Sequence, residues 1–285
     1  MKGVARAKEQ NSPSIDENNK RKRKICERCA RPSPASCICS ALPSEPLALS
    51  NTRLIVLQHP KECKRKNSSL PLIELSLGNN WKTSGDKLAE KKEDFTMYKI
   101  VARRWGEQVV DPAVWNTVNN PDEPVLLCFP SDDAISIEDA MQRISLENQS
   151  QQHTKSVSVT QSETQKQVGS KQYHERKINI IFIDATWKFA KEMDSKTMQN
   201  EGWPKHTIRV KISNFGEDFK PKRFDIRTPP STAHLSTAEC IAQALKVVEE
   251  NGEELFDVLM RPLDLMVQQW HSFSDNNKKR HKTDN

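Results

Sequence analysis

The sequence predicts an α/β protein with a mainly parallel sheet and flanking helices. Short apolar segments of strand length alternate along the chain with segments whose apolar residues recur at helical spacing. Several of the apolar segments end abruptly in polar loops. Loops after the carboxyl ends of parallel strands are the usual ligand site of such a sheet, so these loops are the first place to look for function.

The first half of the chain contains three apolar runs of strand length. They span residues 54–57, 98–102 and 125–130, and polar loops follow the first run at 58–62 and the third at 131–133. Apolar residues at helical spacing predict a helix over 70–77, which Gly78 ends, and a short helix over 136–144.

The second half contains the most apolar strand candidate, residues 178–183. It runs into Asp184 and a helix from 188 to about 198, and a half-exposed strand follows at 208–212. Ser236 and Glu239 form a capping-box pattern that opens the next helix. Pro262 should kink or split the last helix, which carries apolar residues on both sides of it.

Polar and charged segments suggest how the chain is divided. We expect a disordered basic arm over 1–24, a cysteine knuckle over 25–45, a main domain over 46–272 with a flexible insert at 147–175, and a disordered basic tail over 273–285. The net charge of +6 fits a polyanion partner. Basic runs at 20–24 and 278–280 could be import signals or nucleic-acid contacts, although solvated tails are the commoner explanation.

The chain has no apolar run of membrane-spanning length, and its first residues are polar. We therefore expect a protein of the nucleus, the cytoplasm or both, not secreted, and with reduced cysteines. Four of the cysteines cluster, and close pairs joined by a proline-rich loop suit tetrahedral zinc: Cys26, Cys29, Cys37 and Cys39. The zinc would be structural, with Arg28 and Arg31 placed to contact phosphate. Unligated thiols are the alternative, which the clustering disfavours.

Asp184 stands where the most apolar strand meets a helix. The simplest explanation is that Asp184 or Thr186 caps that helix by accepting a backbone N–H bond. Trp187 follows directly, and a large aromatic ring in a ligand-facing loop can stack on a base or on adenine, or pack in the core. The residue pattern alone leaves these explanations open.

The segment Asp184-Ala185-Thr186-Trp187 resembles the Asp-x-Thr-Trp signature of the DTW-domain family. Four other segments resemble the family's elements in the same order: the cysteine knuckle at 26–39, Gln58-His59-Pro60-Lys61-Glu62, Phe129-Pro130, and Leu235-Ser236-Thr237-Ala238-Glu239. The resemblance covers roughly residues 25–270 apart from the polar insert. Five ordered matches identify the chain as similar to this family where one four-residue motif would not.

The resemblance implies a function. Characterised members of the family are tRNA-uridine aminocarboxypropyltransferases, which move the 3-amino-3-carboxypropyl group of S-adenosylmethionine to N3 of a D-loop uridine and leave methylthioadenosine. Their fold is related to knotted SPOUT-type methyltransferases. The implied catalytic residues are Asp184, Thr186 and Trp187. The implied cofactor-binding residues are Phe129, Pro130, Ser131, Leu235, Ser236 and Thr237.

Elementary chemistry narrows the role of Asp184. An ordinary carboxylate is a poor base for an imide proton, so we expect Asp184 to orient and polarise the uracil N3–H while in-line alignment supplies much of the acceleration. His59 could contact RNA or cofactor, or stabilise the turn before Pro60. Arg223 and Arg227 are candidate partners for a carboxylate or phosphate.

Other functions remain compatible with the sequence. An RNA methyltransferase could use the same cofactor through its methyl group and would release S-adenosylhomocysteine. A non-catalytic, zinc-containing RNA-binding module would bind RNA with strong salt dependence but no cofactor. A ribosomal RNA could replace tRNA as the substrate.

Overall fold

The computed structural model describes residues 24–65, 68–78, 81–83, 95–157, 176–212 and 235–283. Its strands form one parallel sheet in the order β2-β3-β1-β6-β4-β7-β5. The strands are β1 Thr52–Gln58, β2 Trp81–Thr83, β3 Met97–Val101, β4 Val125–Cys128, β5 Ile135–Ser136, β6 Ile178–Asp184 and β7 Ile208–Lys211. The predicted α/β class with a mainly parallel sheet is confirmed.

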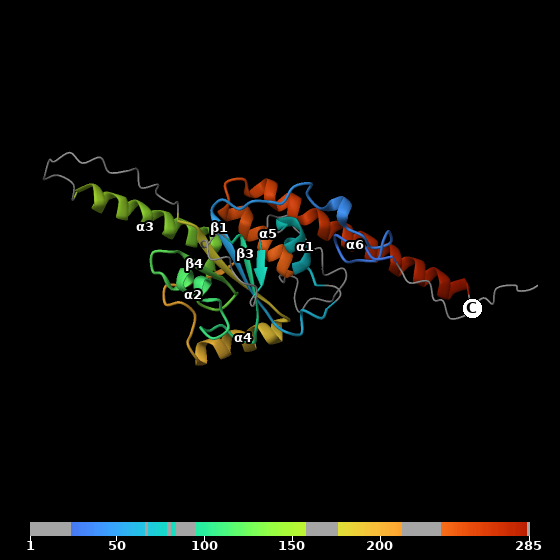
Figure 1. Cartoon of the computed structure of the whole chain (residues 1–285), viewed down its shortest axis with the longest axis horizontal. Helices are drawn as coiled ribbons and strands as arrows, with labels where there is room; N and C mark the ends of the chain where they lie inside the picture. The colour runs from blue at the N-terminus through green and yellow to red at the C-terminus, as the bar shows by residue number, and fades with distance from the viewer. Residues whose placement is uncertain are drawn as a thin grey trace, which may run out of the picture.

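Helices cover both faces of the sheet. They are α1 Leu70–Leu77, α2 Pro112–Asn119, α3 Ile137–Val157, α4 Trp187–Gln199, α5 Thr237–Val248 and α6 Gly252–Thr283, with a short 3-10 turn, η1, at Cys39–Ala41. Figure 1 shows α1, α5 and α6 on one side of the sheet and α4 on the other. Along β1, Leu54 and Val56 pack into the core under α1, α5 and α6, whereas Ile55 and Leu57 pack into the core on the α4 side. Strands apolar on both faces are typical of a parallel sheet covered twice.

Helix α5 is fixed at both ends. The capping box predicted at its start is confirmed, because Ser236 Oγ accepts from the Glu239 amide and the Glu239 carboxylate accepts from the Ser236 amide. At its other end, the Glu249 carboxylate accepts from the Ser50 amide at 3.0 Å and from the Thr52 hydroxyl at 2.5 Å. These contacts join the C-terminal end of α5 to the start of β1.

Two helices are longer than the sequence suggests. Helix α3 reaches Val157, within the segment predicted as a flexible insert from residue 147, and α6 reaches Thr283, within the tail predicted to be disordered from residue 273. Neither extension contains glycine or proline. Pro262 lies inside α6 without splitting it, and Leu259 and Leu263 beside it are buried in the core.

Some expectations fall on residues outside the described ranges. These are residues 20–23 of the first basic run, residues 158–175 of the insert, and Arg223 and Arg227. The link from β7 to α5 is also outside them, so the SPOUT-type knot stays a prediction. Within the described residues, no helix has the length and apolar character needed to cross a membrane.

Candidate active site at the carboxyl edge of the sheet

Asp184 is the last residue of the central strand β6, and its side chain is buried. Its Oδ2 atom accepts a hydrogen bond from Gln58 Nε2 at 2.7 Å, and its Oδ1 atom accepts one from Thr237 Oγ1 at 2.6 Å. Gln58 ends β1 and is the register partner of Asp184, while Thr237 is the first residue of α5. Three elements far apart in sequence therefore converge on one carboxylate.

Neither Asp184 nor Thr186 caps the helix that follows. Thr186 occupies the N-cap position of α4, but its side chain makes no capping hydrogen bond. The Asp184 carboxylate is directed instead to Gln58 and Thr237. The capping explanation for this segment is therefore wrong, and the carboxylate is held by long-range partners.

Gln58 itself is held in one orientation. The Cys63 thiol donates to Gln58 Oε1 at 2.9 Å, which leaves the amide NH₂ group to face Asp184. Sequence reasoning did not single out Gln58 as a site residue, although it found the loop that begins there. The available signal was a polar residue at the end of an apolar strand, but the partner was hidden because it lies 126 residues away in the chain.

A cavity of about 310 Å³ opens beside Asp184. It lies over the carboxyl ends of β4, β6 and β7, and the first turns of α4 and α5 complete its walls. Pockets for small molecules have volumes of roughly 300–1,000 Å³, so this one has room for a compact ligand. Its lining is mainly apolar and includes five of the predicted site residues: Phe129, Pro130, Trp187, Leu235 and Thr237.

The remaining predicted residues, Asp184 among them, do not line this cavity. Ser236 uses its hydroxyl in the capping box of α5. Ser131 follows Pro130 in the loop after β4, and Thr186 is half-buried beside Trp187. No finding tests the roles assigned to the individual site residues, which stay predictions.

Two aromatic rings of the cavity lining contact each other. The rings of Phe129 and Trp187 stack with centroids 5.7 Å apart and planes inclined by 23°. Lys191 Nζ lies 5.1 Å from the centroid of the Trp187 ring. Trp187 is half-buried, so it packs against the core on the α4 side and also presents a surface to the cavity.

His59 lies on the side of Asp184 away from the cavity, because it follows β1. Its buried ring stacks on Phe189, with centroids 4.3 Å apart and planes inclined by 4°. Nδ1 accepts from the Lys61 amide at 3.2 Å, which is the turn-stabilising contact expected before Pro60. Burial lowers the pKa of His59, and the positive charges of Arg103 and Lys61 lower it further. His59 is therefore a neutral imidazole at pH 7 with its proton on Nε2.

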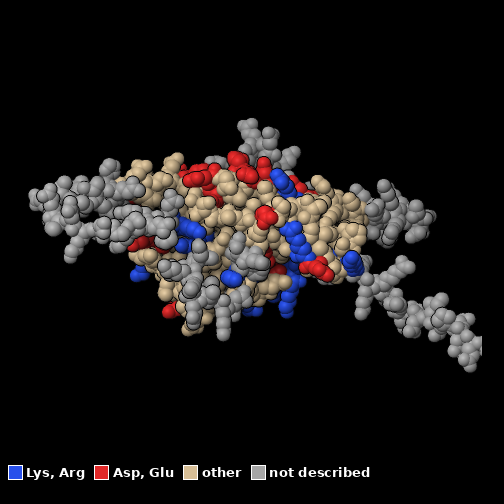
Figure 2. Space-filling model, turned by 45° about the horizontal axis from the view of Figure 1, so that its top comes forward, with Lys and Arg blue, Asp and Glu red and all other residues tan. Residues whose placement is uncertain are grey.

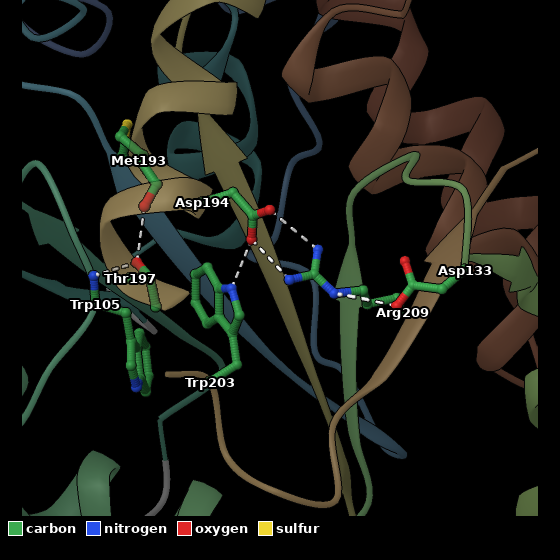
Figure 3. Close-up of polar contacts among 7 residues, drawn as sticks. All are labelled: Trp105, Asp133, Met193, Asp194, Thr197, Trp203 and Arg209. Carbon is green, nitrogen blue, oxygen red and sulfur yellow. Dashed lines mark hydrogen bonds and ion pairs between the residues drawn. The ribbon is translucent and has the colours of Figure 1, made fainter. Parts of the chain in front are cut away.

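An ion-pair network joins the walls of the cavity. The Arg209 guanidinium, on β7, donates to both oxygens of Asp194, on α4, at 2.9 and 3.2 Å (Figure 3). Trp203 Nε1 donates to the same carboxylate at 2.7 Å. Arg209 Nε also lies 3.7 Å from Asp133, in the loop after β4. Because α4 and β7 both contribute cavity walls, the contact between Arg209 and Asp194 joins two of these walls.

A second contact holds α4 from the other side. Figure 3 shows Thr197 Oγ1, on α4, accepting from the Trp105 amide at 3.0 Å and donating to the Met193 carbonyl at 2.8 Å. Trp105 lies in the loop after β3, so α4 is tied to both halves of the sheet.

The cysteine knuckle has the geometry of a metal site. The four sulfur atoms of Cys26, Cys29, Cys37 and Cys39 all lie within 4.8 Å of one another. A zinc–sulfur distance of ~2.3 Å gives a tetrahedron with edges of about 3.8 Å, and two of the observed sulfur–sulfur distances are 3.5 and 3.8 Å. The donor set therefore fits a zinc ion.

Two thiols of this cluster have pKa values shifted in opposite directions. Hydrogen bonds, first of all from the Cys29 amide, lower the pKa of Cys26 to about 6. Burial, together with the neighbouring thiols, raises the pKa of Cys39 to about 12.

The knuckle docks on α6, away from the cavity. Arg31 donates to Met266 Sδ at 3.3 Å, and Gln269 Nε2 donates to the Cys37 carbonyl at 2.8 Å. Arg28 donates to the Pro43 carbonyl at 2.9 Å. The two arginines expected to face phosphate thus make contacts within the protein, which favours a structural role for the knuckle.

The parallel sheet has helices on both faces, and a fixed carboxylate and an aromatic-lined cavity lie at its carboxyl edge. This arrangement is typical of α/β proteins that bind ligands at the carboxyl ends of their strands. The chain belongs to the DTW domain family, whose model matches residues 23–271. The resemblance drawn from the motifs is confirmed. No solved structure matches the chain.

The chain is also similar to several proteins that are named for an activity. The chain is 26% identical over 252 residues to tRNA-uridine aminocarboxypropyltransferase A of Arabidopsis thaliana, covering 86% of this chain and 80% of that protein. It is 27% identical to tRNA-uridine aminocarboxypropyltransferase 2 of Macaca fascicularis, covering 86% and 63%. It is also 27% identical to the protein of that name in Drosophila melanogaster, covering 88% and 75%. The chain thus spans less than two thirds of the macaque protein.

Proposed function

We propose that this chain is an enzyme that transfers the 3-amino-3-carboxypropyl group of S-adenosylmethionine to N3 of a uridine in the D-loop of tRNA. The names of its relatives support tRNA aminocarboxypropyl transfer. The observation that carries the proposal is the Asp184 carboxylate, fixed by Gln58 and by Thr237, which lines the adjoining aromatic cavity. A fixed acceptor next to a cavity for a flat ring suits a reaction between a nucleobase and an adenosine-bearing donor.

The cavity offers a place for each part of the donor. The stacked rings of Phe129 and Trp187 would hold the adenine, as aromatic side chains do. Lys211 is the charged residue among the described lining, and its ammonium group suits the donor's carboxylate. Arg223 and Arg227 remain candidates for the same role. S-adenosylmethionine would supply a carbon activated by the adjacent sulfonium.

Asp184 would position the uracil. Each oxygen of its carboxylate accepts one fixed hydrogen bond and retains capacity for another, which the uracil N3–H can use. Attack by N3 forms the N3–carbon bond while the carbon–sulfur bond breaks, and its electron pair neutralises the sulfonium to give methylthioadenosine. The N3 proton leaves to water. The role of the protein is then alignment of N3 with the carbon, not strong base catalysis.

The cysteine knuckle would hold a structural zinc ion. Its contacts with α6 through Arg31 and Gln269 support a stabilising function outside the reaction.

Product analysis tests the reaction directly. Purified protein, tRNA and S-adenosylmethionine should yield methylthioadenosine and a tRNA uridine heavier by one aminocarboxypropyl group, both measured by mass spectrometry. Release of S-adenosylhomocysteine would assign methyl transfer instead. If tRNA binds but neither product forms, the chain is an RNA-binding module without this activity.

A further inference from the structure

Some basic side chains of the described residues have carboxylate partners, whereas others, such as Arg143 and Lys205, have none among these residues. The described ion pairs include Arg53–Glu123, Arg65–Glu62, Lys99–Glu74 and Lys246–Glu253. On the face shown in Figure 2, Lys and Arg side chains stand in separate groups with Asp and Glu among them. The net charge of +6 therefore does not form one uniform positive field on this face.

Five exposed basic side chains lie along the carboxyl edge of the sheet. Exposed basic side chains follow three of the strands there: Lys61 after β1, Arg103 after β3, and Lys188 and Lys191 on the first turns of α4 after β6. Lys211 ends β7 and is also exposed. Among the residues that the structure describes, none of these five side chains pairs with a carboxylate. Together they are called the basic rim.

The basic rim is interleaved with aromatic rings. Lys61 Nζ lies 4.7 Å from the centroid of Phe189, and Lys191 Nζ lies 5.1 Å from that of Trp187. Both rings are half-buried and so keep part of their surface open. Cations beside open aromatic rings suit nucleotides, whose phosphates and bases need both kinds of contact.

Asp184, at the end of β6, divides the basic rim, and Lys61 and Arg103 are called its outer arm. Strands β3, β1, β6, β4 and β7 are adjacent in the sheet, so the edge from β3 to β7 spans about 19 Å at ~4.8 Å per strand. The cavity occupies the β4 and β7 side. Lys61 and Arg103 lie on the β1 and β3 side, where the Ala102 amide donates to the Gln58 carbonyl at 3.2 Å and holds the two loops together.

We propose that Lys61 and Arg103 of the basic rim bind phosphates of the RNA backbone, on the side of Asp184 away from the donor cavity. The choice of RNA as the partner rests on the proposed function. The geometry adds a separation of tasks, because these two side chains lie across β6 from the cavity and do not line it. Loss of Lys61 and Arg103 should weaken RNA binding and leave donor binding intact.

The test compares two double variants of the full chain. Lys61→Ala with Arg103→Ala removes the outer arm of the rim. Lys205→Ala with Arg143→Ala removes the same charge elsewhere, because Lys205 precedes β7 at the opposite edge of the sheet and Arg143 lies on α3, both exposed. The affinity for unmodified tRNA is measured at several salt concentrations, and calorimetry with S-adenosylmethionine measures donor binding.

The outer-arm variant should bind tRNA roughly tenfold more weakly, with the slope of log affinity against log salt reduced by about 2. The control variant should bind tRNA as the wild type does, and both should keep the wild-type affinity for S-adenosylmethionine. Unchanged tRNA affinity in the outer-arm variant, an equal loss in the control, or no tRNA binding by the wild type would overturn the proposal. The reaction is judged separately, by the products of the wild type, so either proposal can fail alone.

Discussion

Gln58 and Asp184 end adjacent parallel strands in register, and Gln58 Nε2 lies 2.7 Å from Asp184 Oδ2. Together with the Thr237 hydroxyl on the other oxygen, this contact fixes the plane of the carboxylate. A carboxylate that cannot rotate presents its remaining lone pairs in one direction. That preorganisation is the feature on which the proposed reaction depends.

Replacing Gln58 with methionine keeps the size of the side chain and removes the donor to Asp184. We expect the turnover number for methylthioadenosine release to fall by about 10- to 100-fold, because a buried acceptor loses a partner worth roughly 1–3 kcal/mol. Gln58→Glu should be worse, since it places a second carboxylate against the first. Steady-state kinetics at saturating tRNA and donor measure the turnover of both variants. Wild-type turnover by the methionine variant would show that the hydrogen bond from Gln58 to Asp184 does not contribute to the reaction.

Thr237 offers a matched pair of substitutions. Thr237→Val keeps the shape and removes the hydroxyl that donates to Asp184, so turnover should fall by roughly tenfold. Thr237→Ser keeps the hydroxyl and should retain most of the activity. Equal activity of the two variants would show that the hydroxyl contributes nothing to positioning Asp184.

The pair between Arg209 and Asp194 should contribute to stability. Their side chains are 14% and 16% exposed, and the guanidinium binds both carboxylate oxygens. Arg209→Ala should lower the free energy of unfolding by about 2 kcal/mol. It should also raise the KM for S-adenosylmethionine, because the contact that joins β7 to α4 beside the cavity is lost. Urea unfolding and kinetics measure these effects.

Asp133 provides the control for Arg209. It is 71% exposed and 3.7 Å from the same guanidinium, so Asp133→Ala should change the unfolding free energy by well under ~1 kcal/mol. If Asp133→Ala destabilised the protein as much as Arg209→Ala, the assignment of the main contribution to Asp194 would be wrong.

The knuckle should contain one zinc ion per chain, measurable by elemental analysis of protein purified without chelators. Cys29→Ser should abolish the metal and lower the melting temperature, because Cys29 belongs to both the cluster and the core. Cys63→Ser is the control, since Cys63 is exposed and outside the cluster. Metal-free wild-type protein with an unchanged melting temperature would contradict the zinc assignment.

The sequence was informative about the strands that build the site. The apolar segments that become β1, β3, β4, β6 and β7 are visible because a buried parallel strand must be apolar on both faces. The strands β2 and β5 were not predicted, because they are only 3 and 2 residues long. Helix α2, opened by Pro112, was also missed, because only Val114 and Val118 of its eight residues are buried, too few for a clear apolar period.

The contacts of the site could not be predicted in the same way. The contact between Asp184 and Gln58 depends on β6 inserting beside β1, a matter of strand order that local patterns do not encode. Likewise, nothing near Arg209 indicates that its partner is Asp194 on α4. Motif order found the right loops, whereas the tertiary fold decides which side chains meet.

The most direct test of the central claim is the turnover of Asp184→Asn beside its binding of tRNA and S-adenosylmethionine. Asparagine keeps the size of the side chain, and it can accept from Gln58 and donate to the Thr237 hydroxyl, but it lacks the negative charge that would polarise the uracil N3–H. We expect turnover to fall by roughly 100-fold or more with both affinities close to wild type. Near-normal turnover with unchanged binding would contradict the role assigned to Asp184.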